Sequence, residues 1–527
     1  MRDFHLPGRS VVLSTNGMCA TSHPLAAKVA VQMMEQGGNA MDAAIAAAVL
    51  LGFCEPQMTG IGGDLFALVQ PAGEDRIVGL NGSGRAPAGL DAARLRDAAH
   101  TTMPAFSADA VTVPGAVDAF VRLSADWGRL GLKTALAPAI HYARAGVPVG
   151  PRTAFDWALA APDLKGAARD FYLVDGAVPK VGTLFRAPKQ AEVLEKIAMD
   201  GRAGFYEGEV ADDMVNSLRA LGGTHTLDDF AATACDYVEP VSGDYRGYEL
   251  VELPPNGQGA TAILMANILK QFDIGSLPPL GARRAHIEAE AAKLAYDARN
   301  RFMAEADAPG ARLDHLLSED TAKALAGLID PERAMRSPAA LSEQVHKDTV
   351  YLTVVDADRM AVSLIYSIFH SFGSCLASER FGIGFQNRGA GFTLEQGHPN
   401  EAGGGKRPLH TIIPAMLRKE GKLLMPFGVM GGAYQPNGHV RLLSNLVDYG
   451  MELQEAVDAP RSFNRDGSME VERGYPESVR EQLEAMGHSV TIPEVALGGA
   501  QAIWIDPDTG LLSGASDPRK DGCALGY

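Results

Sequence analysis

The chain has 527 residues, and 46% of them are hydrophobic, which is typical of a globular protein with a sizeable buried core. Its formal net charge of −17 argues against a nucleic-acid partner, because little positive charge is available to neutralise a phosphate backbone. The five cysteines are scattered and form no C-x-x-C pair, so they indicate neither a zinc site nor a disulfide framework and favour a reducing, cytoplasmic environment.

The N-terminal region predicts two helices and no membrane segment. Residues 1–17 contain no apolar stretch, so no signal peptide is expected. A helix is predicted over 24–36, because this segment begins with a proline and ends at two glycines. The next helix, 39–53, is apolar on nearly all sides, which predicts burial, and it is too short to span a bilayer. The glycine-rich motif at 59–66 precedes a strand, so we interpret it as a packing turn and not as a dinucleotide-binding loop.

Helices and short strands alternate through the rest of the chain. Helical patterns cover 115–147, 188–199, 258–271, 284–304 and 475–486, and strand patterns cover 247–253, 350–356, 360–368, 409–417 and 499–505. The strands 350–356 and 360–368 are joined by a short polar turn, which predicts a hairpin. Strands at both ends of the chain favour one large layered α/β or α+β body. Residues 305–348 are the least regular and predict an exposed segment that tolerates cleavage.

Thr349 lies directly after that segment, at the start of a predicted strand. A threonine hydroxyl is a weak nucleophile without a base, and one known base is the residue's own α-amino group. That arrangement requires cleavage of the Asp348–Thr349 bond: the hydroxyl attacks the preceding carbonyl, the acyl group moves from N to O, and water releases the ester. The new amine titrates at about 7.7–8.0 in peptides, so it can accept the hydroxyl proton. Considered alone, however, the residue pattern favours an ordinary strand threonine.

Five blocks of sequence resemble the γ-glutamyltransferase (γ-glutamyltranspeptidase) family: 37–69, 136–149, 252–269, 348–364 and 514–522. They occur in the family's order and run through the whole chain. The resemblance implies an N-terminal-nucleophile hydrolase with a four-layer αββα sandwich. It also implies a proenzyme that cleaves itself between Asp348 and Thr349 into a large subunit, 1–348, and a small subunit, 349–527. We expect these to remain together as a heterodimer, with a dimer of heterodimers as an open alternative.

The resemblance also implies roles for individual residues. Thr349 matches the nucleophile, and Ser367 falls where the family has a threonine that contacts it. Thr353 faces the same side of the strand as Thr349, so it is a candidate hydrogen-bond partner of the new amine. The backbone N–H groups of Gly431 and Gly432 match the oxyanion hole.

The substrate-binding positions differ from those of glutamyl transferases. Arg85 matches the arginine that holds a substrate carboxylate. Phe369, Arg388 and Gly391 stand where transferases have the Asn, Gln and Asp that recognise the glutamyl amino group. His410 and Thr411 replace a pair of serines. The loss of an acid and the gain of cations favour a small anion over a zwitterionic glutamyl tail.

These features are more similar to the branch that includes oxamate amidohydrolase. The prediction is therefore a self-processing amidohydrolase, acting on oxamate to give oxalate and ammonia in urate (purine) degradation, with Arg85, Arg388, His410 and Thr411 around the carboxylate. No cofactor, metal or membrane is expected. The enzyme alternatives are a γ-glutamyl hydrolase or transferase acting on glutathione-like substrates, and a cephalosporin-type side-chain acylase. The non-enzyme alternative is an unprocessed scaffold. His410 as a structural histidine, and Arg388 paired with an internal carboxylate, also remain open.

Overall fold

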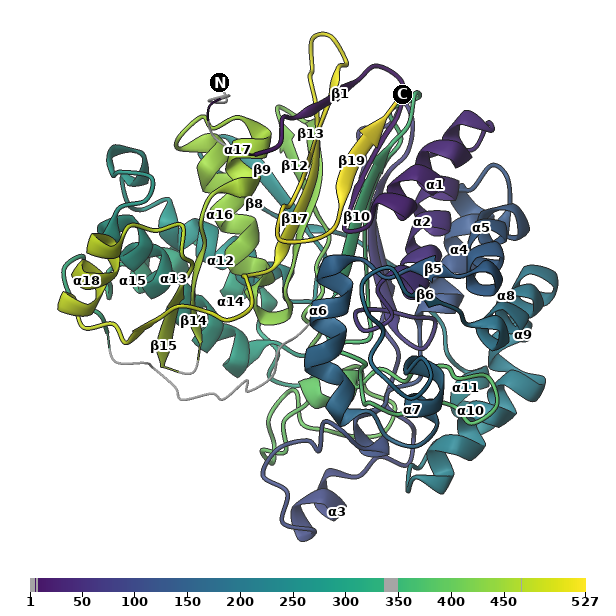
Figure 1. Ribbon diagram of the computed structural model, residues 1–527. Coiled ribbons are helices and arrows are strands. Elements are labelled where there is room, and N and C mark those ends of the chain that lie inside the picture. Colours follow the sequence, from purple (N-terminus) through teal and green to yellow (C-terminus); the bar gives the residue numbers. More distant parts are fainter. Residues whose placement is uncertain (1–4, 6–7, 336–348, 466) are drawn as a thin grey trace.

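Two antiparallel sheets form the centre of the protein, in a computed structural model that describes residues 5, 8–335, 349–465 and 467–527 (Figure 1). Sheet A has the strand order β1 (Val12–Ser14), β18 (Leu512–Ser516), β17 (Gly499–Ile505), β13 (Lys422–Met430), β12 (Ala415–Lys419), β9 (Tyr248–Glu252) and β8 (Val241–Tyr245). Sheet B has the order β19 (Cys523–Gly526), β2 (Met18–Thr21), β10 (Val350–Val355), β11 (Ala361–Ser367), β3 (Asp64–Gln70), β4 (Val78–Gly82) and β7 (Asp236–Val238).

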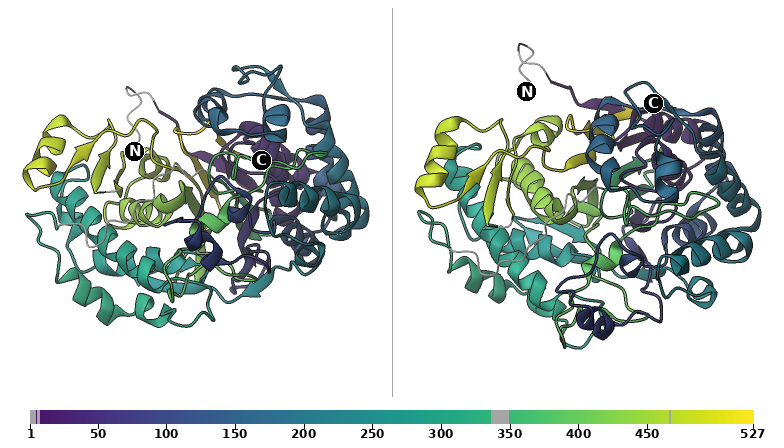
Figure 2. Two further views of the ribbon diagram at one scale, coloured as in Figure 1. Left: turned by 90° about the horizontal axis from the view of Figure 1, so that it is seen from below. Right: turned by 60° about the horizontal axis from the view of Figure 1, so that its bottom comes forward.

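Helices cover the outer face of each sheet, which confirms the predicted four-layer αββα sandwich (Figure 2). Helices α1 (Pro24–Glu35), α2 (Ala40–Cys54), α4 (Ala116–Trp127) and α5 (Leu132–Ala145) form the layer on sheet B. Helices α12 (Gly259–Leu269), α13 (Ala282–Phe302), α16 (Gln435–Val447) and α17 (Leu453–Asp458) form the layer on sheet A. Residues 1–348 and 349–527 both contribute strands to both sheets, so the two segments build one body.

The alternation of side chains along β10 explains how it is buried on both faces. Val350, Leu352 and Val354 belong to the core between sheet B and its helices. Tyr351 and Val355 point the other way, into the core between the two sheets. Thr349, with the same parity as Tyr351, therefore lies at the end of the face that looks toward sheet A.

Most predicted elements form, with two corrections. Helix α2 is buried throughout, and Asn39 and Asp42 cap its start reciprocally. The hairpin of β10 and β11 has the predicted turn. The helix predicted over 115–147 is two helices, because the chain breaks at Gly128 and again at Gly131, whose φ is +80°. The strand predicted over 409–417 begins only at Ala415, since the preceding residues bond to side chains and loops instead of a neighbouring strand.

A small third sheet packs against the outer side of α13. It comprises β14 (Ser462–Arg465), β15 (Ser468–Val471) and β16 (Val490–Thr491). Helix α18 (Glu477–Ala485) connects β15 to β16. Alanines of α13 and apolar side chains of β15 and α18 share one cluster. No helix within the described part of the chain is long and apolar enough to cross a membrane.

Candidate active site

The predicted nucleophile lies at the open end of the central hairpin of sheet B. Thr349 directly precedes β10 and is 2% exposed. In the hairpin register Val350 pairs with Tyr366, which brings Thr349 opposite Ser367, the last residue of β11. The Thr349 hydroxyl donates to Oγ of Ser367 over 3.2 Å. The structure therefore brings two of the predicted catalytic residues together. Asp348, the other side of the predicted cleavage site, lies outside the described residues.

Ser367 connects the nucleophile to a buried cation. Its Oγ accepts from Nη2 of Arg388 over 3.1 Å and from the backbone N–H of Phe369 over 2.9 Å. Phe369 has a φ of +81°, which a bulky residue rarely adopts, and strained backbone of this kind gathers at functional sites. The phenyl ring lies against the guanidinium, with Cζ of Arg388 4.1 Å from the ring centroid. Thr349, Ser367, Phe369 and Arg388 form one connected unit.

Arg388 is fully buried and has no carboxylate partner among the described residues. It begins the short helix η4 (Arg388–Gly391), and its Nη1 donates to Oγ1 of Thr411 over 2.9 Å. Burial lowers the pKa of the guanidinium to about 9, although the charge of Asp64 opposes this shift. Nε, also buried, has no hydrogen-bond partner. At neutral pH the site therefore holds a positive charge that the protein leaves without an ion pair, which is costly unless an anion joins it.

Gly431 and Gly432 lie at the end of β13, the strand of sheet A that packs against β10. Their φ angles are +129° and +58°, in the region that favours glycine. A Cβ on Gly431 would lie 3.0 Å from Cα of Gly498, so a side chain here would press against the backbone of that residue. Gly431 and Thr349 both line a cavity of about 50 Å³. Backbone N–H groups at such a turn are suited to hold the oxyanion of a tetrahedral intermediate.

His410 faces a buried carboxylate. Its Nε2 lies 3.1 Å from Oδ2 of Asp64, and both side chains are 0% exposed. Burial, together with the charge of Arg388, lowers the pKa of His410 to about 3, although Asp64 opposes this. The ring is therefore neutral, and its Nε2–H donates to Asp64. The second oxygen of this carboxylate accepts from the backbone N–H groups of Gly84 and Gly115 and from the amide of Gln386.

Comparison with known proteins identifies the family. The gamma-glutamyltranspeptidase family matches residues 26–527. The chain belongs to this family. It is 35% identical to the glutathione hydrolase-like YwrD proenzyme of Bacillus subtilis, over 98% of this chain and 99% of that protein. It is 33% identical to the oxamate amidohydrolase proenzyme of Klebsiella pneumoniae, over 98% and 99%. The crystal structure of a cephalosporin acylase from Bacillus halodurans superposes with a TM-score of 0.92 at 38% identity, covering 100% of this chain and 99% of that one.

Membership of the gamma-glutamyltranspeptidase family makes the protein a hydrolase of amide bonds of the N-terminal-nucleophile type. The two sequence relatives are proenzymes by name, and the names of the three proteins point to three different substrates. At 33–38% identity these names leave the substrate of this family member undetermined.

Two of the predicted positions bond to residues other than Thr349 in this family member. Thr353 is four residues further along β10, which is about 13 Å at the rise of a strand, and its hydroxyl donates to the carbonyl of Val362 over 3.1 Å. The side chain of Arg85 is 44% exposed, and its Nη1 bonds to Glu305 over 2.6 Å and to the carbonyl of Gly405 over 3.0 Å. Thr353 is thus separated from the unit formed by Thr349, Ser367 and Arg388, whereas Arg85 is paired with Glu305.

The sequence interpretation missed a buried glutamine that connects the two halves of the site. Nε2 of Gln258 donates to the carbonyl of Thr411 over 2.7 Å and to that of Gly432 over 3.0 Å. Its Oε1 accepts from Nη1 of Arg299 over 2.7 Å. Gln258 lies inside the block 252–269 that carried the family resemblance, but the sequence alone assigned no role to this residue. It ties the oxyanion turn to the residue that bonds Arg388.

Proposed function

We propose that the protein is a self-processing amidohydrolase that hydrolyses the amide of a small carboxylate, with oxamate as the preferred substrate. The observation that carries this proposal is the guanidinium of Arg388, which is buried, lacks a carboxylate partner among the described residues, and is joined through Ser367 to the Thr349 hydroxyl. A substrate carboxylate would supply the missing negative charge next to the nucleophile.

The proposed processing step makes Thr349 an N-terminus. Cleavage before Thr349 would leave pieces 1–348 and 349–527 as a heterodimer. Each piece supplies strands to both sheets, so the interface between them is the core itself and separation would require unfolding. This supports a stable complex of the two pieces after cleavage.

In the proposed reaction Oγ1 of Thr349 attacks the amide carbonyl, and the α-amino group of Thr349 accepts the hydroxyl proton. The C–N bond then breaks, and the same amine returns the proton to the leaving ammonia. Water, deprotonated by the amine, attacks the acyl-enzyme ester and releases the acid, which restores the hydroxyl. Ser367 orients the nucleophile, and the N–H groups of Gly431 and Gly432 stabilise the oxyanion, with each donor contributing about 3 kcal/mol.

The spacing between the nucleophile and the cation favours a short acid. Two hydrogen bonds, of 3.2 Å and 3.1 Å, separate Oγ1 of Thr349 from Nη2 of Arg388. In oxamate the carboxylate is bonded directly to the reacting carbonyl, so one small molecule can contact both groups. In a γ-glutamyl amide the carboxylate lies several bonds further away and carries an ammonium group beside it.

The site also offers little for that ammonium group. Asp64 is the acid whose charge acts on Arg388, and it already accepts four hydrogen bonds, from the donors named above and from His410. An ammonium group close to Arg388 would meet a like charge instead of a free carboxylate. In this proposal His410 positions Asp64 and Thr411 positions Arg388, and neither supplies charge to the substrate.

The test compares oxamate with oxamide, its neutral diamide, by ammonia release from the processed protein. The wild-type protein should prefer oxamate, and Arg388→Met should lose that preference because the proposed contact with the carboxylate has been removed. γ-Glutamyl-p-nitroanilide is measured alongside, by release of p-nitroaniline. Strong turnover of the glutamyl substrate with none of oxamate would refute the substrate proposal while leaving the nucleophile in place.

A side-chain acylase is the second candidate. The close superposition with the cephalosporin acylase, at a TM-score of 0.92, favours it. Release of the β-lactam nucleus from glutaryl-7-aminocephalosporanic acid, followed by chromatography, is the discriminating measurement. The protein should hydrolyse oxamate at least about tenfold faster at equal concentration, and the reverse ratio would make the acylase assignment the better one.

A further inference from the structure

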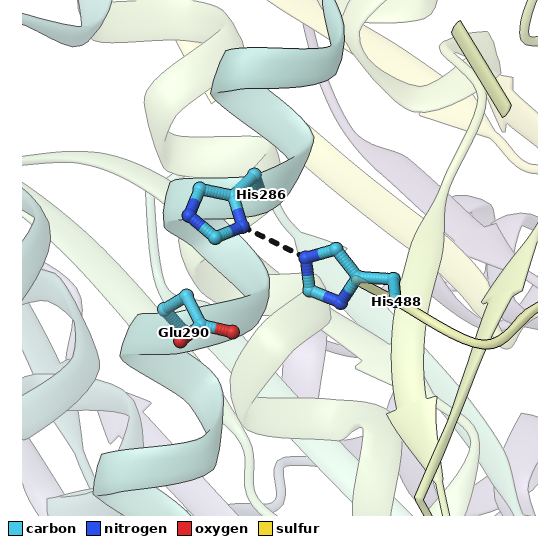
Figure 3. Close-up of side chains that lie close together, drawn as sticks. All are labelled: His286, Glu290 and His488. Atoms are coloured by element: carbon cyan, nitrogen blue, oxygen red, sulfur yellow. Dashed lines mark hydrogen bonds between the residues drawn. The ribbon is translucent and has the colours of Figure 1, made fainter. Parts of the chain in front are cut away.

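A second cluster of polar side chains lies outside the proposed catalytic unit, between α13 and the turn after α18. His286 and Glu290 are one turn apart on α13 and so share a face of the helix. His488 follows Gly487, whose φ is +98°. Figure 3 shows the two imidazoles facing each other, with Glu290 beside them on the same side of the helix. All three side chains are buried, and one ligand atom from each lies within 4.8 Å of the others.

The hydrogen bonds fix which nitrogen of His286 carries a lone pair. Its Nε2 lies 2.8 Å from the carbonyl of Asp330, so Nε2 must be the protonated donor. In the neutral ring Nδ1 then carries the lone pair and can accept from Nε2 of His488, which lies 2.8 Å away. A second ring nitrogen that donates to a backbone carbonyl is the usual arrangement behind a metal-binding histidine.

The other two side chains are also prepared as ligands. His488 is buried, and its Nε2 points at Nδ1 of His286 over 2.8 Å, into the space that it shares with the Glu290 carboxylate. Its Nδ1 bonds to no described residue and can hold the ring proton when Nε2 is used as a ligand. The Glu290 carboxylate is 0% exposed and oriented from both sides, by Nζ of Lys293 over 2.7 Å and by the backbone N–H of Met335 over 2.8 Å.

We propose that His286, Glu290 and His488 form a binding site for a divalent transition-metal ion of the zinc type. Two neutral imidazoles and one carboxylate are a known zinc ligand set, with a water molecule as the fourth ligand. The ion would replace the proton that now bridges the two rings, and that proton would move to Nδ1 of His488. At zinc–nitrogen distances of about 2.0–2.1 Å, tetrahedral geometry separates the two nitrogens by about 3.3 Å, so the rings must move apart by about half an ångström.

The position of the site gives it a structural role. His286 and Glu290 belong to residues 1–348, and His488 belongs to 349–527. If the chain is cleaved as proposed, the ion would hold the two pieces together through ligands that are not part of the proposed catalytic unit. Because only the folded chain assembles the three ligands, binding would also stabilise it against unfolding. The site does not depend on the proposed substrate.

The test uses the full-length protein, stripped with a chelator and kept reduced so that its cysteines do not oxidise. After incubation with ZnCl2 and desalting, elemental analysis should find about one zinc per chain, and the melting temperature should rise. MgCl2 should produce neither effect, since Mg²⁺ prefers oxygen ligands. His488→Gln and Glu290→Gln should weaken zinc binding at least about tenfold in competition with a fluorescent chelator.

His225→Gln is the matched control, because His225 is also buried and its Nε2 also bonds to a backbone carbonyl, that of Val111 over 2.9 Å. This variant should bind zinc like the wild-type protein. Glu290→Gln keeps the shape of the side chain, so it serves if the His488 variant does not fold. Absence of bound zinc in the wild-type protein overturns the proposal. Equal zinc binding by the wild-type, His488→Gln and Glu290→Gln proteins overturns it too, because the metal would then be bound elsewhere.

Discussion

Two buried arginine sites in this protein differ in whether the guanidinium groups have a carboxylate partner. Between α13 and α16, Arg284 and Arg441 both bond to the carboxylate of Glu288, at 2.8 Å each. At the active site Arg388 is just as buried, but it bonds to the hydroxyls of Ser367 and Thr411 and to no carboxylate of the described chain. The first site is complete within the protein. In the function proposed above, a substrate carboxylate would complete the second.

The pKa shifts follow the same division. Burial alone would raise the pKa of Glu288, but the charges of Arg284 and Arg441 bring it below its ordinary value. Burial lowers the pKa of Arg388 to about 9, and Asp64 offsets only part of this. A scaffold gains stability by pairing its charges, whereas a binding site keeps a charge unpaired at a cost in stability.

The largest effect is expected at Thr349, the proposed nucleophile, which is joined through Ser367 to Arg388. Thr349→Ala removes both the hydroxyl that is proposed to cleave the chain and the one that attacks the substrate. We expect a single uncleaved band on a denaturing gel and a loss of ammonia release of at least about 10⁴-fold. Thr349→Ser keeps a hydroxyl and should retain slow cleavage and turnover. A cleaved and active Thr349→Ala protein would contradict the proposed mechanism.

The contrast between the paired and the unpaired arginines is tested by one substitution at each site, at Glu288 and at Arg388. Glu288→Gln leaves two buried guanidinium groups without their shared carboxylate, so we expect a loss of about 3–5 kcal/mol in the free energy of unfolding. Arg388→Met removes a charge that has no ion pair, so its stability should be within about 1 kcal/mol of the wild-type value, or higher. Urea unfolding monitored by circular dichroism measures both. If Arg388→Met were as destabilised as Glu288→Gln, Arg388 would belong to the scaffold.

Acid sensitivity of the site is expected from His410. Its pKa in the folded protein is about 3, below the ordinary value of 6.5, so between these pH values the unfolded chain binds more protons at this residue. Stability from this group is therefore complete above pH 6.5 and decreases as the pH falls toward 3, by about 1.4 kcal/mol per pH unit. Between pH 7 and pH 5 His410→Gln should lose about 2 kcal/mol less than the wild-type protein. Equal losses in urea titrations at the two pH values would show that His410 does not titrate in this way.

The fold and the core of the site could be predicted from the sequence, because both depend on local patterns and on long blocks of family resemblance. The apolar helix 39–53 and the hairpin around Asp356 are examples, and they place Thr349 at a strand end. The contact of Thr349 with Ser367 then follows from the register of that hairpin. Pairing within a hairpin is local, so a sequence specifies it well.

The partners of the long polar side chains could not be predicted in the same way. His410 bonds to Asp64, 346 positions earlier, and Arg85 bonds to Glu305, 220 positions later. Such contacts depend on how the two sheets and their loops pack, which no local pattern records. The separation of Thr353 from Thr349 is different, because the rise of a strand already predicts about 13 Å for four residues.

The smallest effect is expected at Arg85, the other arginine predicted to hold the carboxylate. Its side chain is 44% exposed and paired with Glu305, and an exposed ion pair contributes about 0–1 kcal/mol. Arg85→Met should therefore raise KM for oxamate less than about tenfold, whereas Arg388→Met, which removes a charged hydrogen bond to the substrate, should raise it about a hundredfold. Glu305→Gln provides the control, since releasing Arg85 from its partner should lower KM if Arg85 reaches the substrate and leave it unchanged otherwise. Steady-state ammonia release measures all three variants. A larger effect at Arg85 than at Arg388 would assign the anchor to Arg85, and the unpaired charge of Arg388 would then need a partner other than the substrate.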